Sequence, residues 1–275
     1  MLPFHWKLGS LAITPNELLV VIGAAFAGWL IRRRLMALGS TQGGVLDFIL
    51  AGMGGGAVGA RLYYFLPLWL RGQTTLAALF STWSDGSGFY GAFVGGAIAI
   101  ALTARFKKMP VRSVLDEVFG VVPLGFAIGK IGCFLAGCCY GFPTPSGVRF
   151  APGSLCYITQ RGAHQIPAEA TSSLPVHPVQ LYDLMFGFAF FAALRLLRTR
   201  SKRPGEVFAA CTAGYSLYRF VIEFFRNDPG RDTFGGGPLT DSQYTAIMLF
   251  IVGCIAWVSL RLQKLPAETA PATPK

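Results

Sequence analysis

Seven apolar runs, each close to the length of a bilayer-spanning helix, constrain the fold of this chain more than any motif does. A helix needs about 20 residues to cross the hydrocarbon core of a membrane. Charged residues make up only 13% of the chain, whereas a soluble domain usually has about 25%. We therefore predict an all-α polytopic membrane protein with spans at 16–31, 45–68, 88–106, 114–136, 179–197, 205–225 and 242–262.

The basic residues lie mostly in alternate connections between these runs, which predicts the orientation. Such an excess marks the cytoplasmic side, so the N-terminus is expected outside, the C-terminus in the cytoplasm and the protein in the inner (cytoplasmic) membrane. A nucleic-acid binder gathers its basic residues on one solvent-exposed face, so no nucleic acid is expected as a partner. Fifteen of the 24 basic residues define the cytoplasmic side: Arg32, Arg33, Arg34, Arg105, Lys107, Lys108, Arg112, Arg195, Arg198, Arg200, Lys202, Arg203, Arg261, Lys264 and Lys275.

The chain reads as a single transmembrane domain at residues 1–265, followed by a disordered cytoplasmic tail at 266–275 that is rich in Pro, Ala and Thr. Two long connections are predicted outside, at about 140–178 and 227–241. Long connections in a compact protein often carry function, and simple connecting segments are the alternative.

Charged residues inside the predicted spans are candidate functional groups, because a charge in the membrane is costly unless it is paired or hydrated. Lys130, Arg219 and Glu223 fit an interfacial position least well. Four carboxylates near predicted helix ends are expected to anchor the helices at the membrane interface: Asp47, Asp116, Glu117 and Asp183. The other charged residues within the predicted spans are Arg61 and Arg226.

One face of the sixth run carries Tyr215, Arg219, Glu223 and Arg226, at spacings of four, four and three residues. Arg219 and Glu223 can pair with each other at this spacing. Two arginines for one carboxylate nevertheless leave surplus positive charge. The planar guanidinium matches phosphate oxygens, so this face suits an anionic lipid headgroup.

The stretch GKIGCFLAGCCYG brings Lys130 to the end of the fourth run. Gly125, Gly129 and Gly132 precede and follow it at intervals of four and three, which thins one face of the helix. Thinning allows close helix packing, and it also leaves room for a headgroup or an acyl chain. Both interpretations remain open.

Gly54, Gly56 and Gly59 match the spacing of a dinucleotide-binding fingerprint. That motif requires a preceding strand within a βαβ unit, and these glycines lie inside a predicted membrane helix. We interpret them as packing positions.

Four cysteines are expected at or beyond the outer face: Cys133, Cys138, Cys139 and Cys156. An oxidising compartment favours a disulfide between Cys156 and either Cys138 or Cys139. A nucleophilic thiol is one alternative. A metal site that includes His164 or His177 is another, but it has no standard ligand spacing, and no metal or cofactor is predicted.

The remaining thiol features are interpreted as structural. Cys211 and Cys254 lie inside helices as small packing residues. The sequence LAGC at residues 135–138 resembles a lipobox, but a genuine lipobox follows an N-terminal signal sequence. Cys138 is therefore not expected to accept a lipid.

Five stretches together resemble the prolipoprotein diacylglyceryl transferase family. GKIGCFLAGCCYG resembles the family signature G-R-x-G-N-F-x-N-G-E-x-x-G, and HPVQLYD resembles H-P-[ST]-Q-L-Y-E. YRFVIEFFR resembles the closing R-x-x-x-E-F-x-R segment, while GGAVGARLYY and SGFYGAFVGG resemble the motifs of the second and third helices. The likeness runs from about residue 15 to 262, in the family's order.

The resemblance implies transfer of diacylglycerol from phosphatidylglycerol to the thiol of a lipobox cysteine, with prolipoprotein signal peptides and membrane lipid as partners. It implies catalytic roles for five residues: Arg219, Lys130, Tyr90, His177 and Glu223. It implies phosphatidylglycerol binding by seven residues: Lys130, Arg219, Arg226, Tyr215, Gly129, Gly141 and Arg61.

Four positions depart from the family pattern. Lys130 replaces an arginine and loses its bidentate fork. Tyr90 replaces a histidine, although a phenol with a pKa near 10 is a poor base, and His177 is a candidate substitute. Cys133 and Cys138 replace an asparagine and an acidic residue. These departures keep a second hypothesis open, a family paralogue with a different acceptor or lipid. A small lipid-binding or transport protein is the third, but the inverted repeats typical of transporters are not found.

Overall fold

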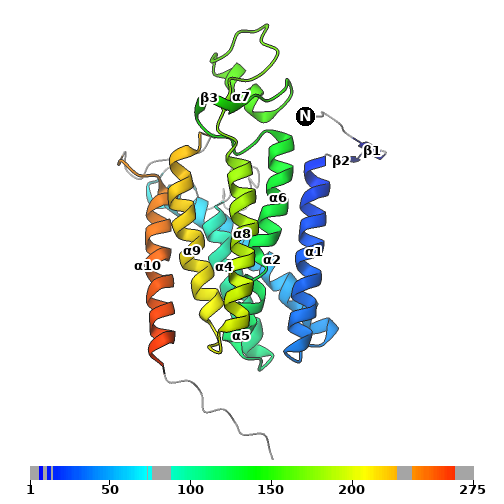
Figure 1. Ribbon diagram of the computed structural model, residues 1–275, viewed down its shortest axis with the longest axis vertical. Coiled ribbons are helices and arrows are strands. Elements are labelled where there is room, and N and C mark those ends of the chain that lie inside the picture. The colour runs from blue at the N-terminus through cyan, green and yellow to red at the C-terminus, as the bar shows by residue number, and fades with distance from the viewer. Residues whose placement is uncertain are drawn as a thin grey trace, which may run out of the picture.

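The computed structural model describes residues 6–8, 11–13, 15–72, 74–75, 88–227 and 237–263. These residues form a bundle of long helices with a small folded segment at one end (Figure 1). The helices are α1 (Pro15–Ala37), α2 (Gln42–Leu70), α4 (Phe89–Phe106), α5 (Val111–Phe119), α6 (Val122–Ala136), α8 (Val179–Arg200), α9 (Glu206–Ile222), the 3₁₀ turn η1 (Glu223–Phe225) and α10 (Asp241–Leu262).

The helices have the length and composition of membrane spans. Five stretches are long and apolar enough to cross a bilayer: Gln42–Leu70, Phe89–Phe106, Val111–Ala136, Val179–Arg200 and Asp241–Leu262. Many of their large apolar side chains face outward, such as Met53, Met185 and Ile255 at 61–70% exposure. A water-facing helix would carry polar groups there, so the fold is that of a polytopic membrane protein.

The other two predicted spans coincide with α1 and with α9 plus η1. The count of seven spans and their sidedness remain predictions. The expected tail at 266–275 and most of the connection at 227–241, residues 228–236, lie outside the described residues.

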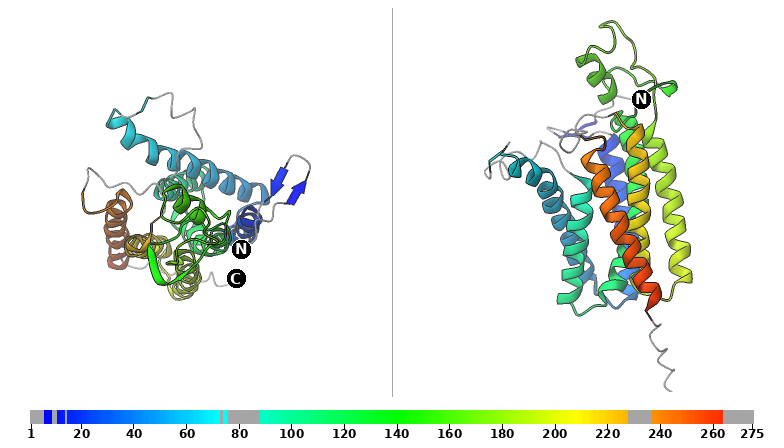
Figure 2. Two further views of the ribbon diagram at one scale, coloured as in Figure 1. Left: turned by 90° about the horizontal axis from the view of Figure 1, so that it is seen from above. Right: turned by 90° about the vertical axis from the view of Figure 1, so that its left-hand side faces the viewer.

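The helix pair α2 and α4 packs closely because both helices carry glycines at four-residue intervals. A Cβ on Gly59 would lie 2.1 Å from the carbonyl oxygen of Gly91, and a Cβ on Gly95 would lie 2.3 Å from that of Gly55. Small residues at this spacing let membrane helices approach backbone to backbone. Figure 2 shows α2 at the periphery of the bundle, where it packs against α4.

The predicted run 114–136 is broken into α5 and α6, which meet at Gly120 and Val121. Pro123 stands in the first turn of α6, where the missing backbone N–H of proline costs nothing. The break places two acidic residues of α5 at the end of the bundle where the basic connections gather, which we call the basic end.

At the basic end, carboxylates connect distant helices. Glu117 accepts hydrogen bonds from Arg34 at 2.9 Å and from Arg198 at 2.8 Å, and so joins α1, α5 and α8. Asp116 accepts from the backbone N–H groups of Gly205 at 2.7 Å and Phe208 at 2.8 Å, which caps the start of α9. These two carboxylates, placed by the sequence at helix ends, hold helices together.

The opposite end of the bundle carries a folded segment, residues 138–178, which we call the cap. It contains the strand β3 (Pro143–Val148) and the short helix α7 (Leu155–Gly162). It has a small core of its own, formed by Tyr140, Phe150, Cys156 and Val176. A hairpin of β1 (Trp6–Leu8) and β2 (Leu11–Ile13) lies toward the same end (Figure 1). The all-α prediction did not anticipate these strands.

Packing of α2 on α4 gives a first prediction. We expect Gly59→Ala to lower the free energy of unfolding by about 1–3 kcal/mol, because the new methyl group overlaps the Gly91 carbonyl. Gly54→Ala is the matched control, since a Cβ there meets nothing within 4 Å. Thermal unfolding in detergent measures both. Equal melting temperatures for the two variants would contradict the close contact. Of the predicted packing glycines, Gly59 is thus the one in tight contact.

Candidate active site

The ends of α6, α8 and α9 meet beneath the cap. The N–H of Gly141 donates to the carbonyl of His177 at 3.0 Å, and the N–H of Phe142 donates to that of Phe225 at 2.9 Å. A backbone bridge also joins Gly141 to Arg226. Three segments that are far apart in sequence are therefore fixed against one another above the charged residues of the bundle.

Lys130 of α6 pairs with Asp183 of α8. Its Nζ lies 2.6 Å from Asp183 Oδ2, as a buried ion pair. The other oxygen, Oδ1, accepts from the hydroxyl of Tyr218 on α9 at 2.7 Å. The Lys130 and Asp183 side chains are only 11% and 3% exposed. Asp183 was expected to anchor at the interface, and this was wrong, because it neutralises a cation inside the bundle.

Glu223 joins two arginines at the end of α9. Its Oε2 accepts from Arg219 one turn earlier, as predicted from the four-residue spacing, and lies 4.0 Å from Nε of Arg226. Its Oε1 accepts from the hydroxyl of Thr240 at 3.1 Å, and Thr240 is the N-cap of α10. One buried carboxylate thus holds two cations and a helix start.

The Lys130 and Arg219 side chains come from helix faces that point toward each other. The rings of Phe126 and Tyr215 meet edge to face, with centroids 5.8 Å apart. Phe126 lies one turn before Lys130 and Tyr215 one turn before Arg219, so each cation lies on its helix face one turn nearer the cap. Together with Arg226, three cations face two carboxylates, which leaves a net positive charge among these five side chains.

Tyr90 lies beside this cluster, in the first turn of α4. Its ring contacts those of Tyr215 and Tyr63, with centroids 6.3 and 6.4 Å away. The residue is 3% exposed, and its hydroxyl has no hydrogen-bond partner within the part of the chain that the structure describes. Buried hydroxyls are normally paired, so this one is available to a ligand.

Three cysteines converge at the junction of α6 and the cap. The sulfur atoms of Cys133, Cys138 and Cys139 all lie within 4.8 Å of one another. Hydrogen bonds from the other two thiols lower the pKa of the Cys139 thiol, and the nearby charges of Lys130 and Arg226 lower it further. The thiols therefore lie next to the cationic cluster.

Cys156 does not join this group. It is a free, buried thiol in the core of the cap, and burial raises its pKa to about 11. All six cysteines are free, so the structure does not contain the disulfide that we expected from Cys156 to Cys138 or Cys139.

The remaining predicted site residues differ in their surroundings. His177 Nδ1 lies 3.2 Å from the Tyr182 hydroxyl, and its ring packs on Phe225. Gly141 is a packing position, because a Cβ there would lie 2.4 Å from the Phe225 carbonyl oxygen. Gly129 has open space beside it instead, since a Cβ would meet nothing within 4 Å. Arg61 is buried in the second half of α2.

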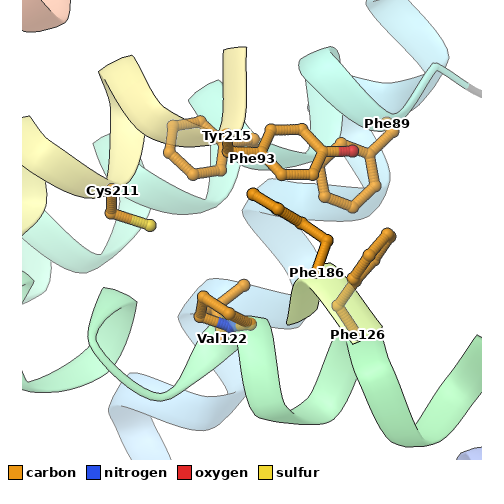
Figure 3. A pocket seen from close by; sticks show the side chains of 8 residues that line it. Phe89, Phe93, Val122, Phe126, Phe186, Cys211 and Tyr215 are labelled. Atoms are coloured by element: carbon orange, nitrogen blue, oxygen red, sulfur yellow. The ribbon is translucent and has the colours of Figure 1, made fainter. Parts of the chain in front are cut away.

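An apolar pocket lies deeper in the bundle, on the basic-end side of the cations. Figure 3 shows aromatic rings from α4, α6, α8 and α9 around it. Its lining consists of Phe89, Phe93, Val122, Pro123, Phe126, Phe186, Cys211 and Tyr215. Phe126 and Tyr215 belong both to this pocket and to the contact beneath Lys130 and Arg219.

Sequence reasoning did not predict the contacts of two residues that organise the site: it gave Asp183 an anchoring role and assigned no role to Gln180. Asp183 and Gln180 lie three residues apart on one face of α8. Asp183 pairs with Lys130 of α6, and Gln180 Nε2 donates to the Cys138 carbonyl, at the start of the cap, at 2.6 Å. That three-residue spacing of two polar groups within an apolar helix was the available signal.

Comparison with known proteins decides the family. The family model described as prolipoprotein diacylglyceryl transferase matches residues 3–259. The chain belongs to the prolipoprotein diacylglyceryl transferase family. It is 29% identical over 266 residues to the phosphatidylglycerol–prolipoprotein diacylglyceryl transferase of Clostridium tetani, covering 96% of this chain and 100% of the relative.

Two further relatives carry the same enzyme name. The Klebsiella pneumoniae protein is 30% identical over 270 residues, which cover 93% of this chain and 92% of the relative. The second such enzyme of Clostridium perfringens is 31% identical over 204 residues, which cover 74% of this chain and 73% of the relative. The predicted family membership is confirmed.

The Lys130–Asp183 pair gives a second prediction. We expect Asp183→Asn to lower the free energy of unfolding by about 3–5 kcal/mol, because it leaves a buried ammonium group without its partner. The double variant Lys130→Met/Asp183→Asn removes both charges and should regain most of that loss. Thermal unfolding in detergent compares the three proteins. An Asp183→Asn protein as stable as the wild type would show that the pair is hydrated and contributes little.

Proposed function

We propose that this protein transfers the diacylglyceryl group of phosphatidylglycerol to the thiol of a lipobox cysteine in prolipoproteins. The products are a thioether and glycerol phosphate. One observation carries the proposal: two facing helices lend Lys130 and Arg219 to a buried cluster with net positive charge. The names of the relatives agree with this activity.

The proposal places the protein in the bacterial inner membrane with seven spans, the N-terminus outside and the C-terminus in the cytoplasm. The helix ends that carry most basic residues gather opposite the cap (Figure 1). Positively charged connections mark the cytoplasmic side, which puts the cap and the cationic cluster on the outer side. Prolipoproteins present the lipobox cysteine from that direction.

In this proposal the lipid phosphate binds at the three cations, Lys130, Arg219 and Arg226. Its glycerol backbone lies toward the apolar pocket one turn deeper (Figure 3), and the open space at Gly129 leaves room for the headgroup. The two carboxylates hold the cations in place before the lipid arrives. Preorganised positive charge stabilises a phosphate that leaves, and needs little rearrangement during the reaction.

The bond changes follow from this position. The acceptor thiolate attacks the glycerol carbon that bears the phosphate, and a carbon–sulfur bond forms as the carbon–oxygen bond breaks. The electron pair of that bond stays on glycerol phosphate, whose charge the cations stabilise. Lys130 contributes a point charge here, whereas the guanidinium groups can bind two oxygens at once.

A second candidate function is a family paralogue that modifies a different acceptor. It is favoured by the side chains at three positions, Tyr90, Cys133 and Cys138, which change the polar surroundings of the site. Complementation of a bacterium depleted of its own transferase separates the two. Rescue of growth supports lipoprotein maturation, and failure to rescue despite activity on small thiols supports the paralogue.

The proposed role of Arg219 gives a third prediction. We expect Arg219→Ala to lower formation of the alkylated lipobox peptide at least about 100-fold, as expected for loss of a preorganised charge at the leaving group. Arg219→Lys should keep the pair with Glu223 and recover part of the rate. Mass spectrometry of the peptide after incubation with phosphatidylglycerol measures the product. Arg105→Ala, at the exposed end of α4, is the control. Unchanged turnover in Arg219→Ala would refute the site.

The Tyr90 hydroxyl, which lacks a partner in the described part of the chain, gives a fourth prediction. Tyr90→Phe should leave the protein as stable as the wild type or more stable, because it removes a buried hydroxyl without a described partner. Turnover should fall, because the variant can no longer make a hydrogen bond from this hydroxyl to the bound lipid or thiol. Tyr63→Phe is the contrasting variant, since its hydroxyl lies 2.7 Å from that of Thr245 and its loss should lower stability. A Tyr90→Phe enzyme with wild-type turnover would exclude a role in catalysis.

A further inference from the structure

The three thiols at the end of α6 have the geometry of a metal-binding site. Cys133 comes from the last turn of α6, and Cys138 and Cys139 come from the turn that follows. The chain reverses through Gly137 at φ 69° and Cys139 at φ 55°. The left-handed region is uncommon for a residue other than glycine and is retained where the surroundings impose it. This reversal brings the three sulfurs to within 4.8 Å of one another.

A second observation supports a ligand at this turn. Gln180 is completely buried, and its Nε2 holds the turn by donating to the Cys138 carbonyl at 2.6 Å. Its Oε1 has no hydrogen-bond partner among the described residues. A buried amide oxygen normally has one. Gln180 therefore holds the turn that carries Cys138 and Cys139, and its Oε1 remains available for a ligand beside that turn.

We propose that Cys133, Cys138 and Cys139 bind one Zn²⁺ ion, and that the fourth position of this ion takes the acceptor thiol as a thiolate. This inference rests on the proposed function. Catalytic zinc sites have three protein ligands and one open position, and no fourth His, Cys, Asp or Glu joins the three thiols within the described ranges. The side chains match that pattern.

The distances and charges fit a zinc ion. Sulfurs bound at about 2.3 Å in a tetrahedral site stand about 3.8 Å apart, so the three thiols need to move together by only about 1 Å. Three thiolates and Zn²⁺ carry one net negative charge. Lys130, one turn before Cys133 on α6, and Arg226, bridged to Gly141, are the cations that offset it.

The proposed zinc ion would provide a way to deprotonate the acceptor thiol. A coordinated thiol loses its proton outright, and at the outer face that proton passes to water. The sulfur then attacks the glycerol carbon, the carbon–oxygen bond breaks, and glycerol phosphate leaves with the electron pair. A thioether is a weaker ligand than a thiolate, so the product is released. Oxidation states do not change in any step.

Location of the thiols supports this role. Lys130 lies one turn before Cys133 on α6, and the backbone bridge between Gly141 and Arg226 brings Arg226 to the segment that follows Cys139. The thiol and the leaving group would therefore be held side by side. Such proximity is a large part of the rate advantage in a two-substrate reaction. Tyr90 and His177, the candidate bases from the sequence, are not required for deprotonation in this scheme.

Metal content of the purified full-length protein tests the site. After reconstitution with Zn²⁺ and removal of loosely bound ions on a desalting column, elemental analysis should find one zinc per chain. Cys133→Ser, Cys138→Ser and Cys139→Ser should each lower that ratio at least tenfold. Cys254→Ser, in α10, is the control and should retain full zinc. X-ray absorption should show three sulfur neighbours at about 2.3 Å.

Activity of the wild-type protein tests the role, and it does not depend on whether variants fold. Removal of zinc with a chelator should lower peptide alkylation at least tenfold while binding of phosphatidylglycerol vesicles is retained, and added Zn²⁺ should restore the rate. Full alkylation by metal-free protein would overturn the zinc inference and leave the proposed function intact. Stoichiometric zinc without any alkylated peptide would overturn both the activating role and the transferase activity.

Two other outcomes would also overturn the site. One is zinc content in the wild type that equals that of the three serine variants. The other is mass-spectrometric detection of a disulfide within the three thiols in protein isolated without reductant, together with no zinc uptake by that protein. Cd²⁺ is a second probe that distinguishes the proposed thiolate site from both outcomes. Cd²⁺ bound by the thiolates gives a sulfur-to-metal charge-transfer band that disappears in Cys139→Ser, whereas nonspecific binding or a disulfide gives no such band.

Discussion

The structure depends on the neutralisation of positive charge inside a bundle whose surface is apolar. A cation in these surroundings is tolerated only with a partner or water, and the bundle supplies carboxylates from neighbouring helices. Asp183 holds Lys130 and thereby fixes α8 against α6. Glu223 holds Arg219 and also receives the hydroxyl of Thr240 at the start of α10. The same contacts that retain the charges therefore set the positions of four helices around the candidate site.

The two ends of the bundle use ion pairs differently. At the basic end, Glu117 lies between Arg34 and Arg198, where the surplus charge faces the connections between helices. Beneath the cap, the surplus charge is buried, and close to it lies the Tyr90 hydroxyl, which has no hydrogen-bond partner among the residues that the structure describes. Structural ion pairs alone do not require such a combination. A bound anion would complete the charge balance and the hydrogen bonding together, which is why this cluster, and not the larger number of basic residues elsewhere, is the candidate site.

The sequence allowed prediction of features that depend on local periodicity. Helix positions followed from apolar length, and the Arg219–Glu223 contact followed from a four-residue spacing. The Lys130–Asp183 pair was not predicted, because its partners lie on different helices far apart in the sequence. Asp183 also lies near the start of α8, just beyond the first turn, where the sequence favours an interfacial position. The close packing of Gly141 on Phe225 was not predicted either, since it arises from chain segments whose proximity no local pattern encodes.

The cysteine positions show how several departures from a family pattern can have one physical explanation. Considered singly, Cys133 and Cys138 replace polar residues and weaken the site. In three dimensions they meet a third thiol, Cys139, in a turn with left-handed backbone that Gln180 braces. Hydrophobic packing would be satisfied by any small apolar side chain at these positions and would not require three sulfurs in contact. Convergence next to the cations of the candidate site is therefore better explained by chemistry on a thiol than by packing.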